Sequence, residues 1–90
     1  MKNGNGKVKE YEKCKLIFEG EYSNGQRNGK GKEYNQITSK LLYEGDYLNG
    51  KRNGKGKEYD IKCKLIYEGE YLNGNKNGKG KEFRDNKIII

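Results

Sequence analysis

Apolar and polar residues alternate over short stretches of this chain, and a run of Asn, Gly and Lys follows each stretch. In LLYEGDYL, residues 41–48, Tyr43 and Tyr47 fall on one face of an extended strand, and Glu44 and Asp46 fall on the other. NGKRNG comes next, and its Asn-Gly pairs supply the positive φ angles that tight turns require. GKGKEY then provides a second extended arm. The pattern predicts a β-hairpin with NGKRNG as its loop.

The hairpin pattern recurs at intervals of about 24 residues. An isolated hairpin is marginally stable in water, so consecutive hairpins joined by short linkers are expected to pair side by side. We therefore predict one all-β domain, a single-layer, elongated and twisted antiparallel meander of consecutive β-hairpins. Its units are residues 1–17 (the second half of an earlier repeat and its connector) and the repeats 18–42, 43–66 and 67–90.

The pairing of the two arms can be predicted from the position of the turn. A turn centred on residues 51–52 places Tyr47 opposite Gly56, and Asp46 opposite Lys57. A glycine opposite a tyrosine lets the ring lie over bare backbone. The Asp46–Lys57 pair, with its equivalents in the other repeats, is expected to form a cross-strand ion pair.

Composition narrows the class of protein further. Apolar residues make up 30% of the chain and charged residues 37%, which is too few apolar side chains to fill a double-layer core. Ten aromatic residues, eight of them Tyr, argue against disorder. The sequence predicts neither a membrane-spanning segment nor a secretory leader. Cys14 and Cys63 share their place in the repeat with Ser39, so we expect no disulfide and a reducing, cytoplasmic compartment.

Catalytic chemistry finds no support in the sequence. The chain contains no histidine, which excludes imidazole general bases and histidine metal ligands. The GKGK segments complete neither a phosphate-loop nor a dinucleotide-binding motif. Because no nucleophile, base or metal constellation is present, we expect no enzymatic activity, no cofactor and no small-molecule substrate.

One face of the predicted sheet carries a stripe of aromatic residues, and two interpretations of it are open. Either the rings only pack neighbouring repeats, or they also leave an aromatic groove in which a partner protein binds, because a single layer has no second sheet to cover it. The stripe consists of Phe18, Tyr22, Tyr43, Tyr47, Tyr67 and Tyr71.

The opposite face carries two rows of lysines, in a chain whose net charge is +7. These lysines either keep a single-layer sheet soluble or contact an anionic phospholipid membrane. Nucleic acid is a less favoured partner, because nucleic-acid modules usually interleave aromatic and basic side chains on one face. The rows consist of Lys30, Lys32, Lys55, Lys57, Lys79 and Lys81.

The segment YEGDYLNGKRNGKGKEY, residues 43–59, closely resembles the MORN repeat (membrane occupation and recognition nexus). That repeat usually reads Y-x-G-x-W/Y-x-x-G-x-x-x/H-G-x-G followed by an apolar residue, and the likeness covers nearly the whole chain. The chain departs from it with Tyr where Trp is commonest, Asn where His is common, and linkers without the usual Asp-Gly turn. The positions that carry these departures are Tyr22, Tyr47, Tyr71, Asn28, Asn53 and Asn77.

The resemblance implies a non-catalytic scaffold that binds a partner protein or another array through the groove formed by Tyr43, Tyr47 and their repeats. Peripheral binding of anionic phospholipid membranes through the lysine rows is the alternative function. The resemblance is also compatible with association with membranes or the cytoskeleton. The apolar segment KIII, residues 87–90, is a candidate edge for pairing with a second copy.

Overall fold

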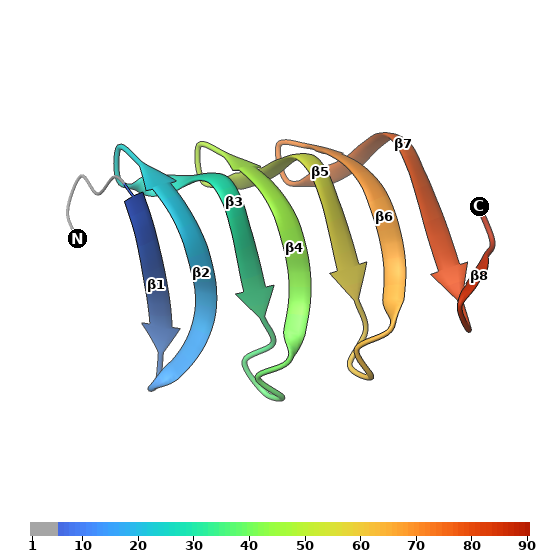
Figure 1. Cartoon of the computed structure of the whole chain (residues 1–90), viewed down its shortest axis with the longest axis horizontal. Helices are drawn as coiled ribbons and strands as arrows, with labels where there is room; N and C mark the ends of the chain where they lie inside the picture. Colours follow the sequence, from blue (N-terminus) through green and yellow to red (C-terminus); the bar gives the residue numbers. More distant parts are fainter. Residues whose placement is uncertain (1–5) are drawn as a thin grey trace.

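The structure is a computed structural model that describes residues 6–90, so residues 1–5 of the predicted first unit lie outside the described part. Its strands form one antiparallel sheet in sequence order, without a second layer (Figure 1). The molecule measures 42 × 28 × 15 Å, which confirms the elongated all-β meander predicted from the repeats. The strands are β1 Gly6–Glu12, β2 Lys15–Ser23, β3 Gln26–Tyr34, β4 Leu41–Leu48, β5 Lys51–Tyr59, β6 Leu65–Leu72, β7 Asn75–Arg84 and β8 Lys87–Ile88.

Each hairpin closes through a two-residue Asn-Gly turn. Between β4 and β5, Asn49 and Gly50 have φ angles of 51° and 86°, as in the type I′ turns that match the twist of antiparallel strands. The predicted loop NGKRNG is therefore too long. Its second Asn-Gly pair lies inside β5, and the equivalent turns are Asn24–Gly25 and Asn73–Gly74.

The earlier turn changes the pairing between the arms. Tyr47 lies opposite Arg52, and Lys57 lies opposite Glu44. The predicted pairs Tyr47–Gly56 and Asp46–Lys57 are therefore wrong. The register also shifts between Gly45 and Tyr47, where the strand forms a β-bulge at Asp46.

The glycine of the second Asn-Gly pair makes room for the side chain at the β-bulge. Gly54 has a φ of 107°, and a Cβ there would lie 2.8 Å from Asp46 Oδ2. The Asp46 carboxylate lies against this glycine and accepts the backbone N–H of Lys55 at 3.1 Å. It forms its ion pair with Lys30 of β3, at 2.5 Å, rather than with Lys57. The same bulge recurs with Glu21 at Gly29 and with Glu70 at Gly78.

The repeats are connected at the opposite end of the strands by turns of two kinds. Residues 13–14 and 85–86 form two-residue turns with positive φ. The two inner linkers are longer and are held by side-chain oxygens. Asn35 Oδ1 accepts the N–H groups of residues 37 and 38 at 2.7 and 3.0 Å, and Asp60 Oδ1 accepts those of residues 62 and 64 at 2.8 and 3.0 Å.

The core of the sheet is a row of aromatic rings that pack edge to face. Centroids of adjacent rings lie 5.2 to 5.5 Å apart along the array. The rings lie over paired glycines, and a Cβ at Gly56 would come within 2.4 Å of Tyr43 Cε1. The predicted packing of ring on glycine is present, with Tyr43 rather than Tyr47 over Gly56. The buried hydrophobic residues are Phe18, Tyr43, Tyr47, Tyr67 and Tyr71.

Candidate functional site

The aromatic face is closed by cations of the chain itself. The guanidinium carbon of Arg27 lies 4.1 Å from the centroid of Phe18, and that of Arg52 lies 4.1 Å from the centroid of Tyr43. In the last hairpin Lys76 takes the same place, 4.6 Å from the centroid of Tyr67. Each hairpin thus covers its own central ring with a basic side chain from its second arm.

A row of ion pairs runs over these rings along the array. Arg27 Nη2 donates to Glu10 at 2.9 Å, and Arg52 Nη2 donates to Glu33 at 3.0 Å. Each arginine also approaches the next glutamate, since Arg27 lies 3.7 Å from Glu33 and Arg52 lies 3.6 Å from Glu58. We call this row, Glu10, Arg27, Glu33, Arg52 and Glu58, the arginine–glutamate ladder.

The ladder also holds the tyrosine hydroxyls. Glu33 accepts a short hydrogen bond from Tyr47, and Glu10 and Glu58 accept equivalent bonds from Tyr22 and Tyr71. Each of these three hydroxyls is therefore bonded to the glutamate of the preceding repeat, on a neighbouring strand. The bonds join one repeat to the next.

These contacts shift the pKa values of the groups involved. Burial and the bond to Glu33 raise the pKa of Tyr47, and burial raises the pKa of Tyr43 to about 12. The hydrogen bond from Arg27 lowers the pKa of Glu10. Burial alone would raise the pKa of Glu33, but the hydrogen bonds from Arg52 and Tyr47 lower it. At neutral pH the carboxylates are ionised and the phenols protonated, which suits a structural role.

The prediction of an open aromatic groove is wrong for five of its six residues. Their exposed fractions are 0 to 4%, because neighbouring rings, glycine backbone and the ladder enclose them. Tyr22 is half-buried and bonded to Glu10. The alternative interpretation, packing between repeats, is confirmed. The enclosed residues are Phe18, Tyr43, Tyr47, Tyr67 and Tyr71.

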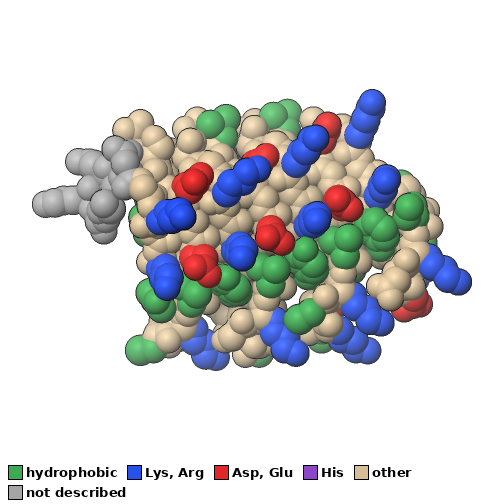
Figure 2. Space-filling view, in the orientation of Figure 1, with side chains coloured by type: hydrophobic (Ala, Val, Ile, Leu, Met, Phe, Trp, Pro, Cys, Tyr) green, Lys and Arg blue, Asp and Glu red, His purple; other side chains and the backbone are tan. Residues whose placement is uncertain are grey.

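The opposite face of the sheet is open and hollowed. A groove of about 1380 Å³ crosses β1 to β7, and its surface alternates between charged side chains and bare backbone. Figure 2 shows this face, where basic and acidic side chains alternate along the array. The bare backbone comes from the glycine pairs whose other side supports the aromatic rings, Gly20, Gly31, Gly45, Gly56, Gly69 and Gly80.

All six lysines predicted to form rows line this groove, on the face opposite the aromatic core as expected. They stand on β3, β5 and β7, and acidic residues stand on the strands between them. Cross-strand neighbours such as Glu44 and Lys57 therefore carry opposite charge. The rows are Lys30, Lys32, Lys55, Lys57, Lys79 and Lys81, and the glutamates are Glu19, Glu21, Glu44, Glu68 and Glu70.

The last aromatic residue of each GKGKEY arm lies beside the groove and was missed as a site residue. The Tyr34 hydroxyl donates to Glu19 at 2.6 Å, and the Tyr59 hydroxyl donates to Glu44 at 3.3 Å. Both rings are half-buried. The recurrence of Glu-Tyr at the end of the second arm in two of the repeats, with Glu-Phe in the third, is the sequence signal that marks these residues.

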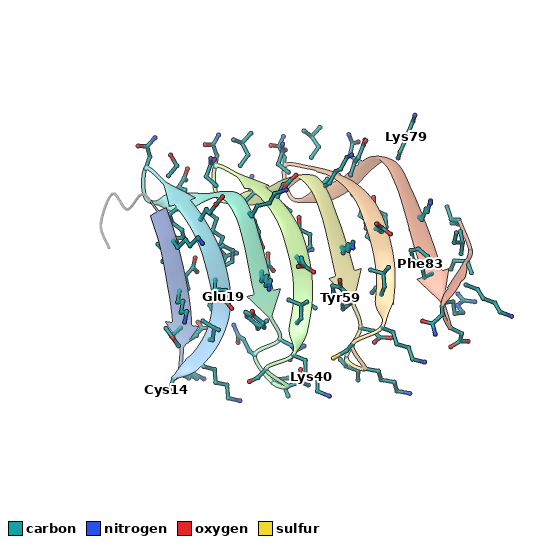
Figure 3. All side chains as sticks on the ribbon, in the orientation of Figure 1. Cys14, Glu19, Lys40, Tyr59, Lys79 and Phe83 are labelled. Carbon is teal, nitrogen blue, oxygen red and sulfur yellow. The ribbon has the colours of Figure 1, made fainter. Side chains whose placement is uncertain are left out.

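The edge of the sheet that carries the linkers presents apolar residues at its loop tips. Ile37 is 86% exposed and Ile61 is 67% exposed. Lysines project from the same edge, and Figure 3 marks it with Cys14 and Lys40. We call this surface the linker edge. Its charged residues are Lys13, Lys15, Lys40, Lys62, Lys64, Arg84 and Lys87, against Glu12, Asp60 and Asp85.

Residues 6–90 contain neither a cluster of potential metal ligands nor a membrane-spanning helix. No group of three or more His, Cys, Asp or Glu side chains in this part could hold a metal ion. Cys14 and Cys63 are exposed free thiols. No helix among the described residues is long and apolar enough to cross a membrane.

The comparisons with known proteins agree with the fold. No curated protein shows significant similarity to the chain. The family model of the MORN repeat, however, matches residues 18–35, 43–61 and 67–87, together more than half of the chain. These matches begin at the same three residues as the predicted repeats, and the described sheet is the expected succession of hairpins. The chain belongs to the MORN repeat family.

Proposed function

We propose that this chain is a non-catalytic scaffold module of the cytoplasm, and that a partner protein binds in the groove on the lysine and glutamate face. MORN repeats are in general associated with binding to proteins or membranes. The observation that carries the proposal is the open groove across β1 to β7, opposite a face that the chain closes on its own. A binding surface spread over all repeats suits an elongated array.

The charge of the groove favours a protein over a nucleic acid. Acidic strands separate the basic ones, so a polyanion lying along the groove would meet repulsive and attractive strands in turn. A protein partner can present both signs, and electrostatic complementarity of this kind gives specificity.

The test is co-precipitation from cells that express the tagged full chain, with quantitative mass spectrometry. Reversing the charge of one groove strand with Lys55→Glu plus Lys57→Glu should abolish capture of specific partners. The matched control is Lys62→Glu plus Lys64→Glu on the linker edge, which should retain them. Equal capture by both variants, with circular dichroism showing intact sheet, would overturn the proposal.

An anionic phospholipid membrane is the alternative partner, and the linker edge supports it better than the predicted lysine rows do. The groove lysines have acidic neighbours, whereas the linker edge combines exposed Ile37 and Ile61 with an excess of lysines. Apolar tips can enter the lipid headgroup region while each nearby lysine adds about 1 kcal/mol of attraction.

Flotation with vesicles of phosphatidylcholine and phosphatidylserine tests this alternative. Binding should fall steeply with salt and be lost on Lys62→Glu plus Lys64→Glu, but persist on Lys55→Glu plus Lys57→Glu. Lys62→Glu plus Lys64→Glu, the control in the co-precipitation assay, is thus the disruptive pair in flotation. Lys55→Glu plus Lys57→Glu is the disruptive pair in co-precipitation and the control in flotation. Absence of flotation at low salt would eliminate the membrane function.

A further inference from the structure

The charges of the groove are arranged by strand. Each strand from β1 to β7 contributes side chains of one sign, two residues apart, to the groove face. The sign then reverses on the next strand, so that the face is divided into bands across its long axis (Figure 2). The basic bands are Lys7 and Lys9, Lys30 and Lys32, Lys55 and Lys57, and Lys79 and Lys81; the acidic bands are Glu19 and Glu21, Glu44 with Asp46, and Glu68 and Glu70.

The distance between successive bands is close to the rise of one turn of an α-helix. Neighbouring strands lie about 4.8 Å apart, so successive bands do too. Successive turns of an α-helix rise about 5.4 Å, whereas same-side residues of an extended chain are about 6.7 Å apart. A helix lying along the array therefore places about one turn over each strand. Over seven strands the mismatch reaches about 4 Å, within the reach of Lys and Glu side chains.

Many of these charges are open to an external partner. Lys55, Lys57, Lys79 and Lys81 are exposed, and none of them takes part in a side-chain ion pair among residues 6–90. On this face only Lys30 forms such a pair, with Asp46, and it remains 79% exposed. An incoming carboxylate therefore meets lysines without displacing an internal partner.

We infer that the groove binds an α-helical segment of a partner protein whose groove-facing side alternates between acidic and basic residues from one turn to the next. Acidic turns lie over the lysine strands and basic turns over the glutamate strands. Such a helix is also stabilised on its own, because oppositely charged residues four apart form favourable pairs. The inference rests on the proposed function, since it names the partner of the same groove.

The experiment uses two synthetic helices of about 24 residues, long enough to cover the seven strands. In one, the facing residues alternate Glu and Lys turn by turn; in the other, the same residues are grouped into an acidic and a basic half. Fluorescence anisotropy with the full chain should show the alternating peptide binding about tenfold tighter or more, from several weak ion pairs. Equal affinities would overturn the inference.

Variants of the chain locate the binding site. Lys55→Glu plus Lys57→Glu makes three consecutive strands acidic and should abolish the preference for the alternating peptide. Lys62→Glu plus Lys64→Glu makes the same charge change off the groove and should preserve it. If neither peptide binds while cellular partners still depend on the groove lysines, the helical partner is wrong and the scaffold function stands. If neither peptide binding nor the capture of cellular partners depends on the groove lysines, the helical partner and the scaffold function are both wrong.

Discussion

Tyr47 joins two repeats through one side chain. Its ring packs edge to face on Phe18 at 5.2 Å and on Tyr43 at 5.5 Å, and its hydroxyl donates to Glu33. It is 4% exposed. The ring contributes hydrophobic burial and the hydroxyl an inter-repeat hydrogen bond, and the two can be separated by substitution.

Tyr47→Ala is expected to reduce the free energy of unfolding by about 3–5 kcal/mol, as for large aromatic residues in other cores. Tyr47→Phe should cost only about 1–2 kcal/mol, because Glu33 keeps its hydrogen bonds from Arg52. Urea unfolding followed by circular dichroism measures both. Equal, small losses would show that the ring is not part of the core. Because Tyr47→Ala weakens the fold, loss of binding by that variant would not identify a binding surface.

The basic residue that stacks on the central ring is arginine in two hairpins and lysine in the last one. Lys76 occupies the place of Arg27 and Arg52 but stacks on Tyr67 without an ion pair among the described residues. Lysine lacks the planar fork that contacts a ring and a carboxylate at once.

Lys76→Arg should therefore stabilise the protein by about 0.5–1 kcal/mol, since the guanidinium can stack on the ring and reach Glu58. The shift of the urea midpoint measures this gain. Lys51→Arg, at an exposed position beside a turn, is the matched control and should leave the midpoint unchanged. A destabilised Lys76→Arg protein would contradict the proposed geometry of the ladder.

At the scale of the hairpin, the arms could be predicted and their register could not. The alternation in LLYEGDYL defines β4 residue for residue, because its ends coincide with turn signals. NGKRNG contains two Asn-Gly pairs, and φ is positive at both residues of the first pair but only at the glycine, Gly54, of the second. One forms the turn and the other the bulge glycine, a choice that depends on the Asp46 carboxylate and the neighbouring strand.

The closure of the aromatic face was not predicted for a related reason. Arg27 and Arg52 stand next to the turns, where the expected loop would have left them in solvent. Only the shorter turn brings them into the strand, opposite Tyr22 and Tyr47. Once the register is known, the ladder follows from the spacing of Arg and Glu. The site could thus be predicted as two faces of opposite character, but not which of them stays open.

The second Asn-Gly pair also connects consecutive hairpins. Asn28 Oδ1 accepts the N–H of Asn49 at 3.2 Å, and Asn53 Oδ1 accepts the N–H of Asn73 at 3.0 Å. Each bond ties the bulge of one hairpin to the turn of the next. Asn77 holds the same position in the last hairpin of this sequence, which has no following Asn-Gly turn.

Asn53→Ala is expected to cost about 1 kcal/mol of unfolding free energy, because the Asn73 N–H loses its acceptor. Asn77→Ala, the matched control, should leave stability within about 0.5 kcal/mol of the parent. Thermal and urea unfolding of the two variants measure the difference. Equal losses would mean that asparagine acts here through its backbone conformation and not through the bond to the next turn.

At the scale of the whole molecule, stability is distributed over interfaces between adjacent repeats. The glutamates of the ladder contact the neighbouring repeat across each boundary, so the charge state of Glu10 and Glu33 affects the entire array. The folded pKa values of Glu10, Glu33 and Asp46 are lowered. Carboxylates of this kind contribute stability above their unfolded pKa, and that stability is lost as pH falls through the folded pKa.

The urea midpoint should consequently be level near neutral pH and fall progressively below about pH 4.5. Glu33→Gln should show a lower midpoint at neutral pH and a shallower fall in acid, because one of the titrating groups is gone. Circular dichroism in urea at a series of pH values measures both curves. A midpoint that stays constant down to about pH 2 would contradict the ladder's contribution.

The direction of the strands has a mechanical consequence. Because the strands lie across the long axis, the hydrogen bonds between them point along it (Figure 1). A pulling force on the two ends therefore loads the strand pairs in series, and each pair opens on its own as a zipper does. Under tension between two attachment points, this protein would extend strand by strand at low force and act as an extensible link.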